Sequence, residues 1–450
     1  MSSEWLPKSE VSLDIKAPLF WERADLDYET RRQFDVCHSC RLCFNLCEYF
    51  PKMFEYIDAT EGQDVKKLTE DQMNDVNGYC FQCKQCFLKC PYTPPHEYAI
   101  DIPRLAMRVT AVNRQQGVAK IQDKIIRDTD LLGQVGSNMP GLTNWMNQNP
   151  VFRTSVLDRG FGIHPDRILP LYHRETFSQW AKRYTASGQY KGSGANGKVV
   201  IFYTCYINYN APGIGKSLVD VLAVNDVDVV VPDQVCCGMP FMEGGMMDEM
   251  IRKIEQNVRV LEPFVRDGYK VIAPGASCAL MLRREYPDLA GSDATRLIAE
   301  NTFEPSEFLV NLWRGNREAV ERQRSVFRWR PGKVVCHVPC HTRAQQVGFR
   351  TRDLFRGLLG PGAQVQLVDK CSAHDGTWGQ KTDYYELSFK YGEPLFNEIE
   401  KAEADVVVTD CWLAGRQIWE ATGVRPLYPT QLLAKMYGFD SGNGDVLGEN

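Results

Sequence analysis

Two cysteine runs near the start of the chain constrain its structure more than any other feature. In the first run, cysteines stand at positions 37, 40, 43 and 47, and in the second they stand at 80, 83, 86 and 90, where Pro91 follows directly. Both runs have the spacing Cys-x2-Cys-x2-Cys-x3-Cys. Eight thiols at a repeated spacing predict a metal-binding segment.

This spacing is typical of proteins that bind two [4Fe–4S] clusters, because three cysteines of one run bind one cluster and the fourth reaches across to the other. The predicted ligands are Cys37, Cys40, Cys43 and Cys90 for the first cluster, and Cys47, Cys80, Cys83 and Cys86 for the second. Structural zinc is the alternative. Zinc sites use pairs of cysteines, and a doubled run of four offers no natural division into such pairs.

Composition and charge argue against several other classes of protein. The chain has 450 residues and a formal net charge of −5, so no overall basic field favours nucleic acid. No run approaches eighteen apolar residues, and we see no secretory signal at the start. Sixteen cysteines in such a chain favour metal binding over disulfides, since a reducing compartment keeps thiols free. We expect a cytoplasmic protein. Peripheral contact with the inner membrane, through a partner, is the alternative.

A repeat follows a glycine- and serine-rich linker at residues 187–197. Three short apolar runs that each lead to a cysteine occur twice, at offsets of 135, 135 and 133 residues. The paired cysteines are Cys205 with Cys340, Cys236 with Cys371, and Cys278 with Cys411. The runs are typical of buried parallel strands, and the segments between them, such as 213–224 and 350–360, have helical periodicity. We therefore expect two α/β repeats whose cysteines converge beyond the carboxyl ends of the strands.

The two repeats differ in their supply of ligands. In the first repeat, Cys237 and Gly238 follow Cys236, so four thiols could hold an iron–sulfur cluster, which we favour, or zinc. Cys236 and Cys237 are the candidate redox centre. In the second repeat Ser372 stands where the first has Cys237, which leaves Cys340, Cys371 and Cys411. That site could use three thiols, recruit Ser372 or His374, or be empty.

Together these motifs resemble a family of iron–sulfur oxidoreductases. The segments that carry the resemblance include CHSCRLC, CFQCKQCFLKCP, VCCGMPFMEGG and CSAHDGTWG. They are similar to the C subunit of anaerobic glycerol-3-phosphate dehydrogenase, to heterodisulfide reductase catalytic subunits and to the iron–sulfur subunit of glycolate oxidase, all with two cysteine-rich CCG domains. YTPPHEYAIDIPRLAMR and LPLYHRETF resemble a longer branch whose genes often stand beside those of rubrerythrin.

The resemblance implies single-electron transfer from a flavoprotein or ferredoxin partner, through the clusters, to an acceptor at the first CCG site. The acceptor would be a quinone, a disulfide or a rubrerythrin-like protein. Noncubane clusters that cleave disulfides use five thiols in this family, and both repeats fall short, because Cys278 and Cys411 are not followed by a second cysteine. No nucleotide-binding glycine motif occurs, so we expect no nicotinamide or flavin in this chain. A disulfide or quinone reductase and a docking subunit with zinc or an empty CCG site remain as alternatives.

The expected fold class combines α+β and α/β architecture, with an α-helical ferredoxin domain followed by two parallel-sheet CCG domains. The predicted segments are an N-terminal extension (1–29), the ferredoxin domain with two clusters (30–110), a helical connector and linker (111–197), the first CCG domain (198–332), a degenerate second CCG domain (333–440) and a flexible tail (441–450). Residues 104–128 predict an amphipathic helix that packs on the ferredoxin domain, with contact to anionic lipid as the alternative. Cys336 is predicted to be a buried structural thiol.

Overall fold

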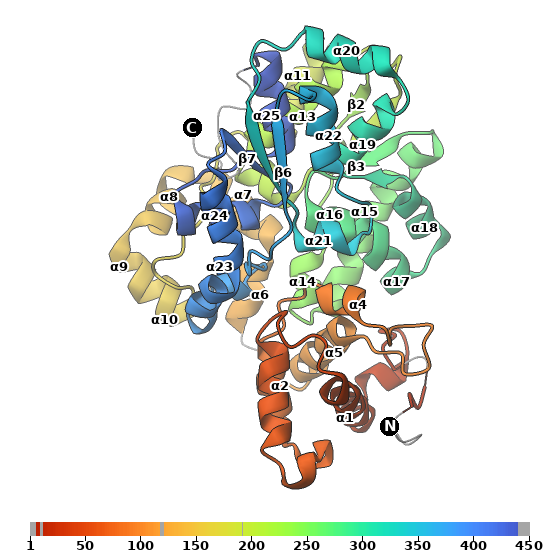
Figure 1. Ribbon diagram of the computed structural model, residues 1–450, viewed down its shortest axis with the longest axis vertical. Coiled ribbons are helices and arrows are strands. Elements are labelled where there is room, and N and C mark those ends of the chain that lie inside the picture. The colour runs from red at the N-terminus through yellow and green to blue at the C-terminus, as the bar shows by residue number, and fades with distance from the viewer. Residues whose placement is uncertain (1–5, 10–11, 118–120, 191, 440–450) are drawn as a thin grey trace. The chain divides into compact units, whose positions relative to one another are not determined.

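The computed structural model describes residues 6–9, 12–117, 121–190 and 192–439, and it divides into two compact units (Figure 1). Unit 1 comprises Met1–Arg127 with Pro240–Met250, and unit 2 comprises Asp128–Met239 with Ile251–Asn450. The predicted tail lies outside the described residues, as do residues 1–5 of the predicted extension. Within the described ranges, no helix is both long enough and apolar enough to cross a bilayer.

Unit 1 is built from helices. They are η2 (Pro18–Trp21), α1 (Arg23–Cys40), α2 (Tyr49–Asp58), η3 (Glu61–Gln63), η4 (Val65–Lys67), α3 (Glu70–Gly78), α4 (Gln85–Lys89), α5 (Ile102–Gln115) and α6 (Ile121–Arg127). α14 (Met239–Glu243) and α15 (Met247–Arg266) continue across the division between the units. The predicted helix at 104–128 is thus two helices, with residues 118–120 outside the description. α5 buries its apolar residues, among them Leu105 and Val112, which confirms that it packs within this unit.

Unit 2 contains two parallel sheets with matching strand order. The first has the order β2-β1-β3-β4, with β1 at Lys198–Ile201, β2 at Asp228–Val230, β3 at Lys270–Ile272 and β4 at Thr302–Phe303. The second has the order β6-β5-β7, with β5 at Lys333–His337, β6 at Gln364–Val368 and β7 at Val406–Thr409. Every pairing in both sheets is parallel. The six predicted strands and the duplicated α/β arrangement are confirmed, whereas the two-residue β4 was missed.

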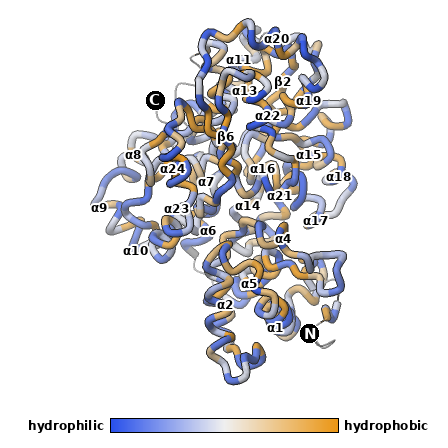
Figure 2. The backbone as a smooth tube through the Cα atoms, in the orientation of Figure 1, coloured by the Kyte–Doolittle hydropathy of each residue, from blue (hydrophilic) through white to orange (hydrophobic). Residues whose placement is uncertain are grey.

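The helices of unit 2 cover both faces of the second sheet. One core packs Val334, Cys336 and Val408 against α22 and α25, and another packs Val335 and Val407 against α23 and α24. This alternation follows from strand geometry, since successive side chains point to opposite faces. Cys336 is fully buried in the first of these cores, which confirms the prediction that it is a buried thiol. Figure 2 shows hydrophobic and hydrophilic residues alternating along most of the helices, as expected of elements that bury one side.

The remaining helices connect the strands or precede them, and those predicted at 213–224 and 350–360 are confirmed as α13 and α22. They are α7 (Thr129–Asn138), α8 (Pro140–Gln148), α9 (Pro150–Phe152), η5 (Arg153–Asp158), α10 (Arg159–Phe161), α11 (Phe177–Ala186), α12 (Cys205–Tyr209), α13 (Pro212–Val224), α16 (Ala276–Leu280), η6 (Met281–Glu285), α17 (Tyr286–Ala290), α18 (Asp293–Glu300), α19 (Pro305–Trp313), α20 (Arg317–Ser325), α21 (Cys340–Ala344), α22 (Arg350–Leu359), η7 (Trp378–Gln380), η8 (Thr382–Tyr384), α23 (Tyr385–Ala402), α24 (Trp412–Thr422) and α25 (Pro429–Tyr437).

A buried arginine of α5 connects this helix to α1 and to η2, the short helix that precedes α1. Arg108 of α5 is fully buried and donates hydrogen bonds to the carboxylate of Asp25 at 2.8 Å and to the carbonyl of Phe20 at 2.7 Å. Removal of one partner from a buried ion pair leaves an uncompensated charge. We expect Arg108→Met to lower the free energy of unfolding by about 3–5 kcal/mol.

Urea unfolding followed by circular dichroism would measure this change. Lys67→Met is the matched control, because Lys67 pairs with Glu61 at the surface at 2.9 Å and such pairs contribute about 0–1 kcal/mol. Equal losses in the two variants would contradict the assigned role of Arg108.

Candidate metal centres

All sixteen cysteines of the chain are free thiols in the structure, and none forms a disulfide. Eight lie in unit 1, and the other eight lie in unit 2. Where they gather, and what surrounds them, determines which group they could hold.

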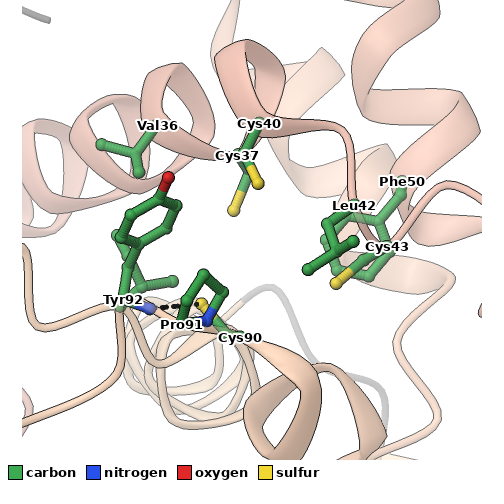
Figure 3. Close-up of a pocket in the computed structure, with 10 residues that line it drawn as sticks. Val36, Cys37, Cys40, Leu42, Cys43, Phe50, Cys90, Pro91 and Tyr92 are labelled. Atoms are coloured by element: carbon green, nitrogen blue, oxygen red, sulfur yellow. Dashed lines mark hydrogen bonds between the residues drawn. The ribbon is translucent and has the colours of Figure 1, made fainter.

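Four thiols from both cysteine runs line one cavity in unit 1 (Figure 3). Cys37 and Cys40 end α1, Cys43 follows in the next loop, and Cys90 follows α4. The cavity encloses about 320 Å³, part of it open to solvent, and its other lining residues are Val36, Leu42, Phe50, Pro91, Tyr92 and Ile100. The four cysteines predicted for the first cluster are thus brought together, in a pocket whose wall is otherwise mainly apolar.

The residues between the cysteines include three with left-handed backbone conformations. Arg41, Gln82 and Lys84 adopt left-handed backbone conformations, with φ of 53°, 50° and 60°. The N–H of Arg41 donates to the carbonyl of Cys37 at 2.8 Å and ends α1 there. Such conformations are uncommon for residues other than glycine, and they reverse the chain within the short spacers that separate the ligands.

The thiols of this first set disfavour ionisation when no metal is bound. Burial raises the pKa of Cys37 well above its usual range, and the neighbouring thiols of Cys90, Cys43 and Cys40 raise it further. Burial and the Cys90 thiol raise the pKa of Cys43 to about 11. The N–H of Tyr92 donates to Cys90 Sγ at 3.4 Å. Bound metal cations would reverse this pKa shift, because they stabilise the thiolate form.

A second set of thiols gathers beside Tyr49. Burial raises the pKa of Cys86 well above its usual range, followed by the thiols of Cys80 and Cys47. The buried Tyr49 hydroxyl also has a pKa raised well above its usual range, by burial and then by Cys80 and other thiols of both sets. The side-chain amide of Gln82 donates to Cys80 Sγ at 3.7 Å. Cys83 stands half-buried between Gln82 and Lys84, in the same turn.

In unit 2, the first CCG thiols lie at the carboxyl ends of three neighbouring strands. Cys205 begins α12 after β1, Cys236 and Cys237 follow β2, and Cys278 lies in α16 after β3. The thiols form a continuous series of hydrogen bonds that links Cys205 to Cys236, Cys236 to Cys237, and Cys237 to Cys278. Cys236, Cys237 and Cys278 are only 2%, 2% and 3% exposed, whereas Cys205 is half-buried.

The hydrogen bonds of this set favour one thiolate among its members. Donation by the Cys205 and Cys237 thiols holds the pKa of Cys236 well below its usual range. The Thr129 hydroxyl and the Gly238 N–H act in the same direction. The pKa of Cys205 is raised, because Cys205 donates to Cys236 and is buried.

The second CCG thiols occupy the corresponding strand ends. Cys340 begins α21 after β5, Cys371 follows β6, and Cys411 immediately precedes α24 after β7. Burial raises the pKa of Cys340 well above its usual range, and Cys371 and Cys411 raise it further, so the three thiols share one neighbourhood. His374 is 6% exposed, and neither of its ring nitrogens has a hydrogen-bond partner among the described residues. Ser372 and His374 both stay candidates for a fourth ligand.

The loops after β2 and β6 keep a common conformation although their residues differ. Gly238 follows the cysteine pair with φ of 94°, and Ala373 stands at the corresponding position with φ of 51°. A left-handed conformation costs an alanine about 1–2 kcal/mol that a glycine does not pay. The second repeat has thus retained the turn of the first, while it has lost both the second thiol and the glycine.

No group of three or more histidine, cysteine, aspartate or glutamate side chains in the described part of the chain is arranged to hold a single metal ion.

Histidines near these sites make ordinary hydrogen bonds. His341 Nδ1 lies 2.8 Å from Ser277 Oγ, which joins the residues that neighbour Cys340 and Cys278. His337 bonds to Thr409 Oγ1 at 2.9 Å, and burial lowers its pKa to about 4. His38, beside the first cluster loop, bonds to Asp58 at 2.8 Å.

Sequence reasoning missed a buried pair of carboxyl groups near the CCG thiols. Glu304 accepts hydrogen bonds from Thr342 at 3.0 Å and Gln345 at 2.8 Å, and Asp410 accepts one from Thr351 at 2.6 Å. Both carboxyl groups are only 2% exposed. Burial and the nearby Asp410 raise the pKa of Glu304 to about 8. No sequence signal marks Glu304, because its environment is created by elements far apart in the chain.

Comparison with known proteins places these sites within recognised domains. The cysteine-rich domain CCG matches residues 199–283 and 334–414, and the Fer4-like domain of citrate utilization protein B matches residues 30–116. The C subunit of anaerobic glycerol-3-phosphate dehydrogenase from Escherichia coli K12 is 32% identical over 319 residues, which is 70% of this chain and 77% of the relative.

Two other relatives cover about half of the chain. The B subunit of fumarate reductase (CoM/CoB) from Methanothermobacter marburgensis is 28% identical over 49% of this chain and 41% of its own length. Lactate utilization protein A from Bacillus pumilus is 35% identical over 48% of this chain and 87% of its own length. The similarity thus extends over both the Fer4-like and the cysteine-rich regions.

Exchange of the turn residues tests the comparison of the two CCG loops. We expect Ala373→Gly to raise the free energy of unfolding by about 1 kcal/mol, because glycine adopts the left-handed conformation without strain. The reciprocal Gly238→Ala should lower it by at least as much. Thermal unfolding of both variants under anaerobic conditions would measure the changes, and stabilisation by Gly238→Ala would contradict the assigned backbone conformations.

Glu304 gives a prediction for the pH dependence of stability. Its pKa is about 8 in the folded protein and near the ordinary 4.5 when unfolded, so the folded state binds more protons between these values. Stability contributed by the protonated group is therefore lost as pH rises from 4.5 through 8. Because Gln cannot ionise, Glu304→Gln should become more stable relative to wild type as pH rises through this interval.

Unfolding in urea at the two ends of the interval would measure this difference. Glu318→Gln is the control, since Glu318 is an exposed residue of α20. A stability difference between Glu304→Gln and wild type that does not change with pH would show that Glu304 is ionised in the folded protein.

Proposed function

The chain belongs to the family of CCG-domain iron–sulfur proteins that includes the C subunit of anaerobic glycerol-3-phosphate dehydrogenase, and we propose that it passes single electrons between a redox partner protein and an acceptor. It is an iron–sulfur protein with a redox role. Clusters of this type accept and release electrons singly, and their surroundings set the potential. The chain's own part is to hold the sulfur ligands, exclude water and tune that potential.

The number and type of clusters form part of the proposal. Two [4Fe–4S] clusters would use the crossed ligand sets of the N-terminal runs, and a third cluster would use Cys205, Cys236, Cys237 and Cys278. The observation that carries this proposal is the cavity lined by Cys37, Cys40 and Cys43 of the first run together with Cys90 of the second. Thiols from both runs on one cavity are what the crossed arrangement requires.

Burial of the first CCG set favours electron transfer over direct substrate reduction. Three of its four cysteines are at most 3% exposed, which leaves little room for a disulfide or quinone at those three sulfurs, and Cys205 is half-buried. The set also lacks the fifth thiol of the noncubane sites in the family. Disulfide or quinone reduction at this centre is therefore the second candidate, and a docking subunit with zinc is the third.

The partner is proposed from the names of the relatives. Two of them are called subunits, of anaerobic glycerol-3-phosphate dehydrogenase and of fumarate reductase (CoM/CoB). We infer a comparable redox partner here, either a flavoprotein subunit, a ferredoxin or a rubrerythrin-like protein, with a quinone as a further acceptor. A cytoplasmic location, with peripheral contact at the inner membrane through that partner, and the absence of a nucleic-acid partner belong to the same proposal.

Metal analysis of anaerobically purified protein tests the proposed clusters. Two cubanes require about eight irons per chain, and a third cluster adds about three or four. We expect Cys237→Ser to lose the iron of the first CCG site and the electron throughput to an added acceptor. Cys83→Ser should instead lose one cubane signal in electron paramagnetic resonance (EPR) and destabilise unit 1.

Cys336→Ala is the matched control, because Cys336 is a fully buried thiol in the core that packs the second sheet against α22 and α25. It should leave both iron content and EPR signals unchanged. If Cys237→Ser also retains metal and throughput, the first CCG domain is not a redox centre. About eight irons with one zinc per chain would instead favour the docking role.

A further inference from the structure

Helix α7, which lies outside both matched CCG segments, forms part of the first CCG site. It packs closely on α12, the helix that Cys205 begins, because its contact face carries glycine. A Cβ atom added to Gly133 would lie 2.1 Å from the Tyr209 ring, and one added to Gly136 would lie 2.4 Å from the Tyr172 ring. Only a bare backbone allows this approach, so the first turn of α7 has a fixed place beside the thiols.

The second residue of that turn anchors it to the loop that carries the cysteine pair. The Asp130 carboxylate accepts the backbone N–H of Cys236, with Oδ2 at 2.9 Å and Oδ1 at 3.2 Å. Asp130 Oδ2 also lies 2.6 Å from Nζ of Lys253, in α15. The anchor therefore joins α7, α15 and Cys236, and it fixes the position of the preceding residue, Thr129.

Thr129 directs its hydroxyl at two of the thiols. Its Oγ1 is buried and makes no hydrogen bond to another described residue. The hydroxyl lies close enough to Cys205 and Cys236 to lower the pKa of both thiols. The hydroxyl is not needed to cap α7, because the Asp128 side chain performs this role by accepting the N–H of Leu131 at 3.1 Å. A buried donor that faces sulfur atoms as its acceptors indicates a role toward those sulfurs.

We propose that Thr129 donates a hydrogen bond to the sulfur ligands of the first CCG cluster and thereby raises its reduction potential; this inference rests on the proposed function. A donor beside a thiolate stabilises the reduced state, which carries one more negative charge, more than the oxidised state. The connector, and not only the cysteine-rich domain, thus sets the potential of this centre.

Redox titration of the full-length, anaerobically purified protein, monitored by EPR, tests this role. Thr129→Val removes the hydroxyl and keeps the shape of the side chain, so the midpoint potential of the first CCG cluster should fall. Thr129→Ser, which restores a hydroxyl, should return the potential toward the wild-type value. The signals of the ferredoxin-type cubanes serve as internal controls and should not shift.

Thr154→Val is the matched control, since the Thr154 hydroxyl bonds to the carbonyl of Pro150 at 2.9 Å and not to a thiol. An unchanged potential in Thr129→Val with full iron content would overturn the proposal. Loss of first-site iron from both Thr129→Val and Thr129→Ser would also overturn it, because Thr129 would then act structurally. Failure of the proposed function is distinguishable, because wild-type protein would then show no first-site cluster to titrate.

Discussion

The crowding of buried thiols is the constraint on which the rest of this structure depends. Thiols that are removed from water and placed beside one another resist ionisation, as the raised pKa values of Cys37, Cys86 and Cys340 show. A cluster of thiolates is stable in such surroundings only when metal cations compensate its charge. Folding of these regions and metal binding are therefore coupled, and the apolar wall of the first cavity increases this dependence by excluding water.

Parallel sheet topology explains how cysteines far apart in sequence meet in unit 2. Carboxyl ends of parallel strands lie at one edge of a sheet, so a cysteine after each of three neighbouring strands reaches a common place. The order β2-β1-β3 recurs as β6-β5-β7, which produces the arrangement twice. Contacts between the halves, such as Ser277 with His341 at 2.8 Å and the stacked rings of Tyr206 and Trp412, place the two sites in one packed unit.

The two halves have diverged around a retained backbone. Gly238 and Ala373 both adopt a left-handed conformation, although only glycine adopts it without strain. The second half therefore has the same type of turn without the glycine that favours it. The first half has four thiols in hydrogen-bonded contact, and α7 packs beside them through Asp130, which accepts the N–H of Cys236. The second half has three thiols, and His374, whose ring nitrogens have no partner in the described part of the chain, lies three residues beyond Cys371. Proposed electron transfer through the first half is consistent with this difference.

The sequence by itself determined the spacing of the cysteines, the duplication and the six strands that precede cysteines. These features are local: the spacing of cysteines is set by the geometry of the group they bind, and a buried strand requires a short apolar run. Only the tertiary structure decided that Thr129 and Asp130 meet Cys236, that Glu304 is buried with Asp410, and that β4 extends the first sheet. Such contacts join segments far apart along the chain, and they depend on how helices pack, which local patterns of hydrophobicity do not encode.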